Sequence, residues 1–237
     1  MLDVIDYKNI NKCKRYFTTD LNRNSKIYYD KGILHKILLN EHKDLKIILE
    51  LLNKLNLEEL VEVKNLICNN NLILGYSMKN YKEYKSLNNF NKRDLYLKKE
   101  DCFKIVKSHQ DLLKYNLCYT DYHKGNILLN PNNNDIKICD LDSLVFAKEN
   151  LSIKNLLVFI LSYLYNIKYN HVRNVILSNF DADNTFIEYE LRGIKNIDCN
   201  KILELINNID YRDIEEDREI IINRSKELIK TGYNKFY

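Results

Sequence analysis

Short runs of apolar residues, bounded by turn-forming residues, dominate the first third of the chain and predict strands. The expected strands cover residues 15–17, 26–29, 33–39, 60–64 and 72–78. Turn chemistry separates them, with Gly32 after residues 30–31 and three Asn residues at 69–71. Between Asp44 and Leu55, by contrast, apolar residues recur at helical spacing. Residues 1–78 are therefore expected to form a small antiparallel sheet with one helix.

From residue 79 onward the apolar spacing becomes helical, apart from a short hairpin between residues 119 and 143. Helices are expected at residues 99–115, 152–166, 170–179, 184–191, 200–208 and 212–230. The segment 152–166 is nearly all apolar, which predicts a buried central helix. The pattern as a whole predicts an α+β protein with a sheet-containing part, 1–78, and a mainly helical part, 79–237.

Composition narrows the class of protein. The chain has 237 residues, 45% of them apolar, so it is long and hydrophobic enough to bury a core. Its net charge of +4, from 37 basic and 33 acidic residues, is too balanced to indicate a nucleic-acid partner. The six cysteines have no metal-site or redox spacing, and no secretory signal pattern or apolar run of about 20 residues occurs. We expect a cytoplasmic protein with no membrane partner.

Chemically active residue types gather between Tyr119 and Ser143. Asp121 is followed five residues later by Asn126, and fourteen residues further by Asp140. A turn that starts at Asn130 separates two short apolar runs, so a hairpin would carry Asp121 and Asn126 at the end of one strand and Asp140 at the end of the other. Phosphoryl transfer needs such a set: a carboxylate that accepts the proton of the attacking hydroxyl, and an amide and a second carboxylate that hold Mg²⁺. A plain polar loop beside a hairpin is the simpler alternative.

The motif Asp121-Tyr-His123-Lys124-Gly-Asn126, followed by Asp140-Leu-Asp142, resembles the catalytic and metal-binding loops of the protein-kinase-like superfamily. It is most similar to the branch of aminoglycoside phosphotransferases and choline kinases. The resemblance implies a two-lobed fold, ATP and Mg as cofactors, and transfer of the γ-phosphate to a hydroxyl group.

The same resemblance assigns a role to each residue of the motif. Asp121 would be the catalytic base, and Asn126 and Asp140 would bind Mg²⁺. Asp142 would take a second metal or hydrogen-bond the loop. His123 would brace the loop, and Lys124 would either neutralise the transferring phosphate or lie exposed.

Nucleotide-binding residues follow from the resemblance in the first part of the chain. Lys36 matches the strand lysine that contacts the α- and β-phosphates, and Glu50 on the following helix is the candidate acid that pairs with it. An ordinary solvated lysine and an exposed helix glutamate are the alternatives. Met78, Lys79 and Tyr81 would lie at the hinge that binds adenine, although Met78 also suits a hydrophobic core.

The chain departs from the family pattern in several places. The stretch Asp20 to Ser25, where a glycine-rich loop is expected, contains no glycine, so Ser25 and Asn24 would have to supply donors to phosphate. Only nine residues separate Asp142 from Ser152, too few for the long segment with which protein kinases dock a peptide. A small-molecule hydroxyl acceptor is therefore expected. A minimal protein kinase with a protein acceptor, and a pseudokinase that serves as a nucleotide-binding interaction module, are the alternatives.

Overall fold

The structure, a computed structural model, describes residues 2–16, 25–70, 72–90, 97–147, 153–177, 197–209 and 214–230. These residues form two compact units, of which the first contains residues 1–89 and 124–146 and the second residues 90–123 and 147–237. Strands and helices occur together, so the α+β class predicted from the sequence is confirmed. The grouping differs from the expected boundary after residue 78, because the hairpin of residues 124–146 belongs with the sheet and not with the helices.

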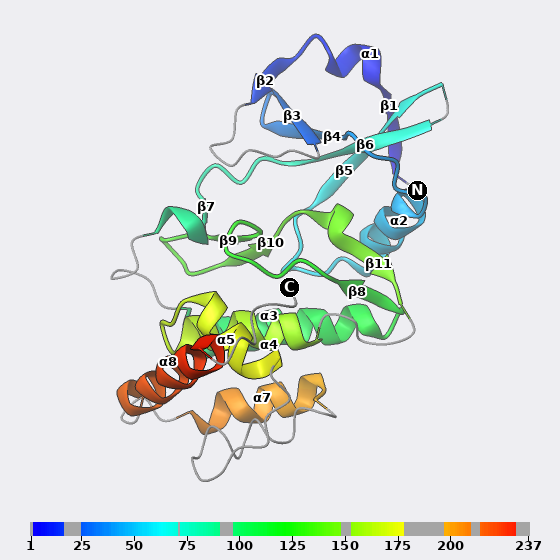
Figure 1. The fold of residues 1–237 in the computed structure, drawn as a ribbon. Helices are drawn as coiled ribbons and strands as arrows, with labels where there is room; N and C mark the ends of the chain where they lie inside the picture. Colours follow the sequence, from blue (N-terminus) through cyan, green and yellow to red (C-terminus); the bar gives the residue numbers. More distant parts are fainter. Residues whose placement is uncertain are drawn as a thin grey trace. The chain divides into compact units, whose positions relative to one another are not determined.

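The first unit contains a six-stranded sheet, drawn in blue to cyan in Figure 1, with the strand order β1-β5-β6-β4-β3-β2. Its strands are β1 (Asp3–Asp6), β2 (Lys14–Tyr16), β3 (Ser25–Asp30), β4 (Ile33–Leu38), β5 (Val63–Asn69) and β6 (Leu72–Lys79). All neighbours pair antiparallel except β1 and β5, which are parallel. Lys36 on β4 lies between Ile27 on β3 and Tyr76 on β6.

One predicted strand begins later than expected. The sequence predicts a strand over residues 60–64, but β5 starts at Val63 and runs to Asn69. Residues just before β5 pair elsewhere, because the amide of Val61 donates to the carbonyl of Ile138 and the amide of Ile138 donates to the carbonyl of Glu59. The segment that leads into β5 is thereby hydrogen-bonded to the hairpin of residues 124–146. β1 and the short helix α1 (Tyr7–Ile10) were not predicted.

Helix α2 (Leu45–Leu55) confirms the predicted amphipathic helix. Its apolar positions Leu45, Ile48, Leu49 and Leu52 are buried, at the spacing of one helical face. The helix ends at Asn56, which adopts the left-handed conformation (φ 47°) that commonly terminates helices. α2 packs against β5 and β6 and so covers part of the sheet.

Successive side chains of β4 point to opposite faces of the sheet, as in any strand. Ile37 packs with Ile10, Tyr28 and Ile67 in an apolar cluster. His35, on the same face of β4 as Ile37, is buried, and its Nδ1 lies 2.8 Å from the hydroxyl of Ser77. Lys36 points to the other face, where the register places Tyr76 opposite it.

A second, three-stranded sheet of the first unit has the order β10-β9-β7 and consists of β7 (Lys85–Ser86), β9 (Ile127–Leu129) and β10 (Ile136–Ile138). β9 and β10 form the predicted hairpin. Its turn is closed by the amide of Asn130, which donates to the carbonyl of Asp135 at 2.9 Å, and by the side chain of Asn130, which accepts from the amide of Asn132. The 3-10 helix η1 (Leu87–Asn89) follows β7, and the 3-10 helix η2 (Leu141–Ser143) and strand β11 (Leu144–Phe146) follow the hairpin.

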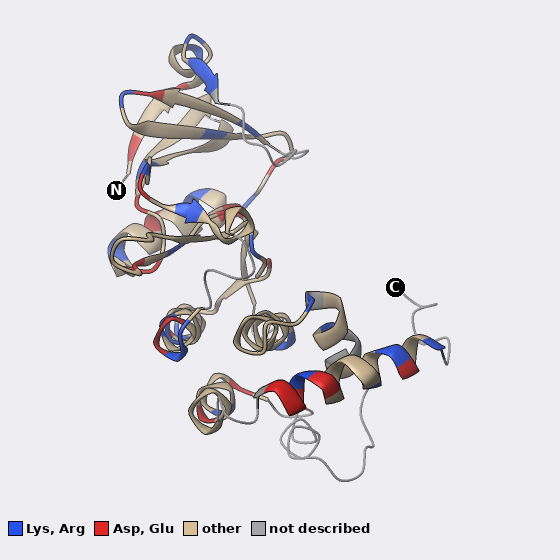
Figure 2. Cartoon of the chain, turned by 90° about the vertical axis from the view of Figure 1, so that its left-hand side faces the viewer, with Lys and Arg blue, Asp and Glu red and all other residues tan. Residues whose placement is uncertain are grey.

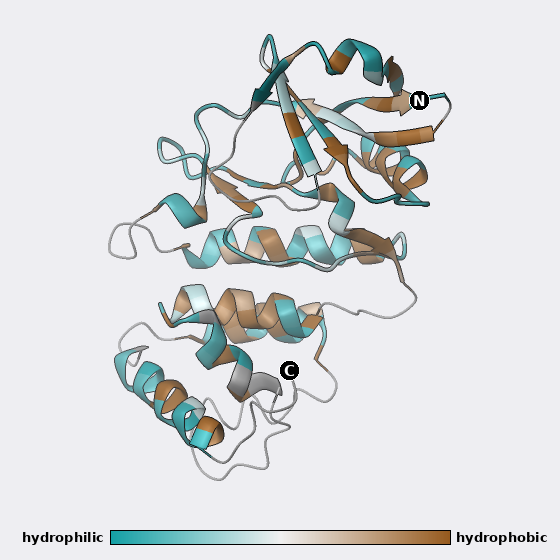
Figure 3. Cartoon of the chain, turned by 45° about the horizontal axis from the view of Figure 1, so that its top comes forward, coloured by the Kyte–Doolittle hydropathy of each residue, from teal (hydrophilic) through white to brown (hydrophobic). Residues whose placement is uncertain are grey.

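The second unit is mainly helical. It contains α3 (Lys99–Leu113), β8 (Leu117–Tyr119), α4 (Ile153–Leu164), α5 (Tyr169–Leu177), α7 (Cys199–Asn208) and α8 (Ile214–Lys230). α3 packs against α7, and α5 packs against both α4 and α8. α4 is buried along most of its length, which confirms the predicted central helix, and Figure 3 shows its hydrophobic character. The helix expected at residues 184–191 lies outside the described residues.

Charge is arranged favourably along α8. Glu215, Glu216 and Asp217 occupy its first turn and Lys230 its last, which matches the helix dipole at both ends (Figure 2). No helix in the part of the chain that the structure describes has the length and apolar character needed to cross a membrane.

Gly75 on β6 lies against the backbone of β4, and this leads to a first prediction. A Cβ atom at this position would lie 1.9 Å from the carbonyl oxygen of Lys36. Because the obstacle is backbone, a Gly75→Ala variant should lower the free energy of unfolding by about 3 kcal/mol in urea titrations. Lys26→Ala at an exposed position of β3 is the matched control and should change it little. A Gly75→Ala protein as stable as wild type would contradict the close approach.

His35 leads to a second prediction, on pH. Burial lowers the pKa of His35 from its ordinary value of 6.5, against a smaller opposing influence of Asp30. The unfolded chain therefore binds a proton at a pH at which the folded chain does not, so the contribution of His35 to stability is complete above about pH 6.5 and decreases as the pH falls below it. In His35→Gln, whose amide can still bond Ser77, the decrease in unfolding free energy between pH 7.5 and pH 5 should be smaller than in wild type. Equal decreases in the two proteins would refute the assignment to His35.

Candidate functional site

The side chain of Lys36 is the centre of the candidate site. It is only 4% exposed, and its ammonium group forms ion pairs with Asp140 and, at 2.5 Å, with Asp142 Oδ1. Both carboxylates lie just after β10, more than a hundred positions along the chain from Lys36. An ammonium group in the interior is costly unless it is paired and hydrogen-bonded, so these two acids are what allows Lys36 to be buried.

Electrostatics determine the protonation state of Lys36. Burial acts to lower the pKa of its amine, but the carboxylates of Asp142 and Asp140 outweigh burial, and the net effect is a raised pKa. Lys36 is therefore a cation at neutral pH. Such a group binds anions such as phosphate, whereas nucleophilic lysines require a lowered pKa.

The segment Asp140–Asp142 is held by a tyrosine of the sheet. The hydroxyl of Tyr76 accepts a hydrogen bond from the amide of Leu141 (3.1 Å) and donates one to Asp142 Oδ1 (3.0 Å). Tyr76 is fully buried, and burial, followed by the charge of Asp142, raises its pKa well above the ordinary value, so the phenol keeps its proton. This clamp was not predicted, because a tyrosine in an apolar strand carries no functional signal in the sequence.

Asp140 itself has an unusual backbone. It lies in the left-handed region (φ 65°, ψ 49°), which non-glycine residues adopt rarely, although Asp and Asn tolerate it best. The conformation turns the chain from β10 into η2. Its carboxylate accepts from Lys36 through Oδ1 and from the hydroxyl of Ser143 through Oδ2 (3.1 Å).

Asn126 lies next to this turn in the same unit. The amide of Cys139 donates to the carbonyl of Asn126 at 2.9 Å, so Asn126 is beside the residue that precedes Asp140. Asn126 is buried, with 7% exposure. The structure thus brings Asn126, Asp140, Asp142 and Lys36 into one unit. Among the described residues, no group of three or more His, Cys, Asp and Glu side chains is arranged as a metal site.

Asp121 belongs to the helical unit, where it follows β8. Its side chain is 52% exposed, and its Oδ2 lies 3.3 Å from His123 Nε2. Tyr122 between them is buried, with its hydroxyl 2.8 Å from His109 Nδ1 and its ring edge-to-face with Tyr119. The buried aromatic residues anchor the loop, while the side chains of Asp121 and His123 are exposed.

The acid expected to pair with Lys36 does not do so. Glu50 is on α2 and forms no ion pair with any residue that the structure describes, whereas the carboxylate partners of Lys36 are Asp140 and Asp142. The reason is geometric: the turn after β10 reaches the ammonium group and satisfies it. Sequence spacing alone could not distinguish among acids at positions 50, 140 and 142.

The remaining predicted residues are distributed over the first unit. Met78 is buried in β6 opposite Leu34, which is a core position. Lys79 is exposed, and its ammonium group lies 5.5 Å from the centre of the Tyr81 ring. Ser25 is buried at the start of β3. The backbone carbonyl of Lys124 accepts a hydrogen bond from the hydroxyl of Ser86. Residues 20–24, where a glycine-rich loop was expected, lie outside the described residues.

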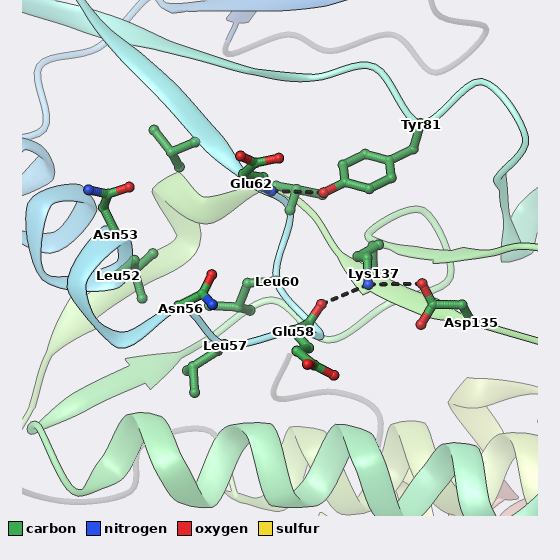
Figure 4. Close-up of a pocket in the computed structure, with 12 residues that line it drawn as sticks. Leu52, Asn53, Asn56, Leu57, Glu58, Leu60, Glu62, Tyr81, Asp135 and Lys137 are labelled. Carbon is green, nitrogen blue, oxygen red and sulfur yellow. Dashed lines mark hydrogen bonds and ion pairs between the residues drawn. The ribbon is translucent and has the colours of Figure 1, made fainter. Parts of the chain in front are cut away.

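Tyr81 contributes to a pocket of about 310 Å³, drawn in Figure 4. The pocket is bordered by the end of α2, the segment 56–63, and residues Asp135 and Lys137 of the hairpin. Several of its polar groups are paired: the Tyr81 hydroxyl accepts from the amide of Glu62, and Lys137 contacts Asp135 and the carbonyl of Glu58 (Figure 4). None of Lys36, Asp140 and Asp142 lines it.

The paired state of Lys36 leads to a third prediction. Lys36→Met removes the cation between two partly buried carboxylates, which are 26% and 19% exposed. Such removal should lower the free energy of unfolding at pH 7 by about 2 to 3 kcal/mol, less than for a fully buried pair because water reaches the acids. Lys26→Met, at the exposed position of β3, is the matched control for urea titration. Equal stability of the two variants would show that the Lys36 pairs contribute little.

Comparison with known proteins assigns no family to the chain. No protein-family model matches it, and no curated protein matches its sequence. The residues and contacts described above therefore carry the case for its function.

Proposed function

We propose that the chain is an ATP- and Mg²⁺-dependent phosphotransferase of the protein-kinase-like type, which moves the γ-phosphoryl group to a hydroxyl of a small molecule. The observation that carries this proposal is the buried Lys36 cation, held by the Asp140–Asp142 segment, with Asn126 fastened beside that segment. A fixed cation, an amide and two carboxylates in one unit are the groups with which proteins hold a nucleotide and its metal ion.

The donor set suits Mg²⁺ bound together with a nucleotide. Mg²⁺ is commonly held by one or two carboxylates plus substrate phosphates rather than by a protein cage. Asn126 and Asp140 would hold the ion, which when bound neutralises charge on the phosphates.

The protein residues would divide the reaction between them. Lys36 binds phosphate oxygens through its ammonium group, which remains charged. Asp121 accepts the proton of the acceptor hydroxyl as that oxygen bonds to the γ-phosphorus, and the bond from phosphorus to the bridging oxygen of ADP breaks. His123, 3.3 Å from the Asp121 carboxylate, orients it. The short stretch between Asp142 and Ser152 favours a small acceptor over a docked peptide.

A second candidate function is a nucleotide-binding interaction module without turnover. It is favoured by one observation: both carboxylate oxygens of Asp140 already have protein partners, Lys36 and Ser143. A module of this kind would shift its melting temperature with Mg²⁺–ATP but release no ADP, whereas an enzyme would show the shift and also release ADP. Transfer of label from ATP to protein bands, in turn, would indicate a protein kinase.

Asp121 leads to a fourth prediction. Asp121→Asn keeps the shape of the side chain but removes its basicity, so ADP release with an acceptor should fall by roughly 10²- to 10⁴-fold while Mg²⁺–ATP affinity stays unchanged. Coupled-enzyme assay and calorimetry measure the two quantities. Asp111→Asn, which alters an exposed pair with Lys114, is the matched control. Unchanged turnover in Asp121→Asn would remove Asp121 as the base.

A further inference from the structure

The two carboxylates that contact Lys36 are held differently. Asp142 Oδ1 accepts from Lys36 at 2.5 Å and also from the hydroxyl of Tyr76 at 3.0 Å. Asp140 has no bond from Tyr76, and its second oxygen is bonded by Ser143, a neighbour within its own turn. Among the described residues, the Asp142 carboxylate is therefore bonded to the sheet through both Lys36 and Tyr76, whereas the Asp140 carboxylate is bonded to it through Lys36.

The register of the sheet explains why Tyr76 can do this. Lys36 on β4 and Tyr76 on β6 are direct partners across the strands, so their side chains leave the same face of the sheet side by side. The approach of Gly75 to the carbonyl of Lys36 brings the two strands close together at this point. The paired backbones of β4 and β6 thus set the positions of the Lys36 ammonium group and the Tyr76 hydroxyl. These two donors together determine where the Asp142 carboxylate lies.

We propose that Asp142, clamped by Tyr76, is the positioning residue that fixes Lys36 for phosphate binding, the part that the sequence suggested for Glu50. This inference rests on the proposed phosphotransferase function. It assigns different tasks to the two acids: Asp140, together with Asn126, would hold the metal ion, and Asp142 would stay with Lys36. The second hydrogen bond of Tyr76, accepted from the amide of Leu141, holds the backbone between the two acids.

Double-mutant cycles on unfolding test the arrangement without reference to catalysis. The cycles pair Lys36→Met with Asp142→Asn, with Tyr76→Phe and with Glu50→Gln, and compare the folded-to-unfolded ratio in urea. The factor by which Lys36→Met lowers the folded-to-unfolded ratio should be at least fivefold smaller in the Asp142→Asn background and about twofold smaller in the Tyr76→Phe background. In both backgrounds the interaction between Lys36 and Asp142 is already weakened. With Glu50→Gln it should be unchanged. Additivity with Asp142→Asn, or strong coupling with Glu50→Gln, would overturn the proposal.

Nucleotide kinetics supply the functional readout. Asp142→Asn and Tyr76→Phe should raise KM for ATP by about tenfold and about threefold, while KM for the acceptor stays constant, because only the phosphate-binding cation is displaced. Glu50→Gln should match Glu41→Gln, an exposed acid that serves as control. An equal rise in both KM values would indicate general damage and count against a positioning role.

The unfolding cycles and the nucleotide kinetics test the positioning role and the proposed function separately. If the wild type neither binds nor turns over Mg²⁺–ATP, the proposed function fails, but the unfolding cycles still decide whether Asp142 or Glu50 holds Lys36. If Asp142→Asn does not fold, Tyr76→Phe carries the test, since it removes one hydroxyl and keeps the ring in place.

Discussion

The burial of one ammonium group is the constraint on which the first unit depends. Lys36 lies in the middle strands of a sheet with almost no access to water, where a lone charge would be strongly unfavourable. Two carboxylates from the far end of the hairpin remove that cost. Because they come from a distant part of the chain, the ion pairs also join the sheet to the Asp140–Asp142 segment.

Several local features are arranged so that these charges meet. Gly75 permits the close approach of β6 to β4, and the resulting register puts Tyr76 opposite Lys36. The hairpin turn at Asn130 sets the register of β10 against β9, and the left-handed backbone of Asp140 redirects the chain after β10. The segment before β5 is hydrogen-bonded to β10, which ties the hairpin to the sheet a second time. Each of these features is a backbone constraint that acts on the same few side chains.

Chemistry in such a site follows from what the charges can do. Lys36 stays protonated, so it serves as a fixed positive charge, and its acids compete with any incoming phosphate for that charge. A nucleotide that brings its own metal ion would satisfy the acid that it displaces. In the loop of Asp121, the buried rings of Tyr119 and Tyr122 hold the backbone, and the carboxylate is exposed. In the proposed phosphotransferase, Lys36 would supply the fixed positive charge and Asp121 would supply the base.

The sequence by itself determined the elements whose signals are local. Apolar spacing located α2, α3 and the buried α4, and turn residues located the β9–β10 hairpin, because helix periodicity and turn preference depend on neighbouring residues. Only the tertiary structure decided which acid pairs with Lys36, that Tyr76 clamps Asp142, and that the hairpin groups with the sheet. These depend on strand register and on contacts between residues as much as 106 positions apart, and such contacts leave no periodic trace in the chain. From the sequence alone, Glu50 and Asp142 are both acids that could pair with Lys36, and the fold brings Asp142 to it.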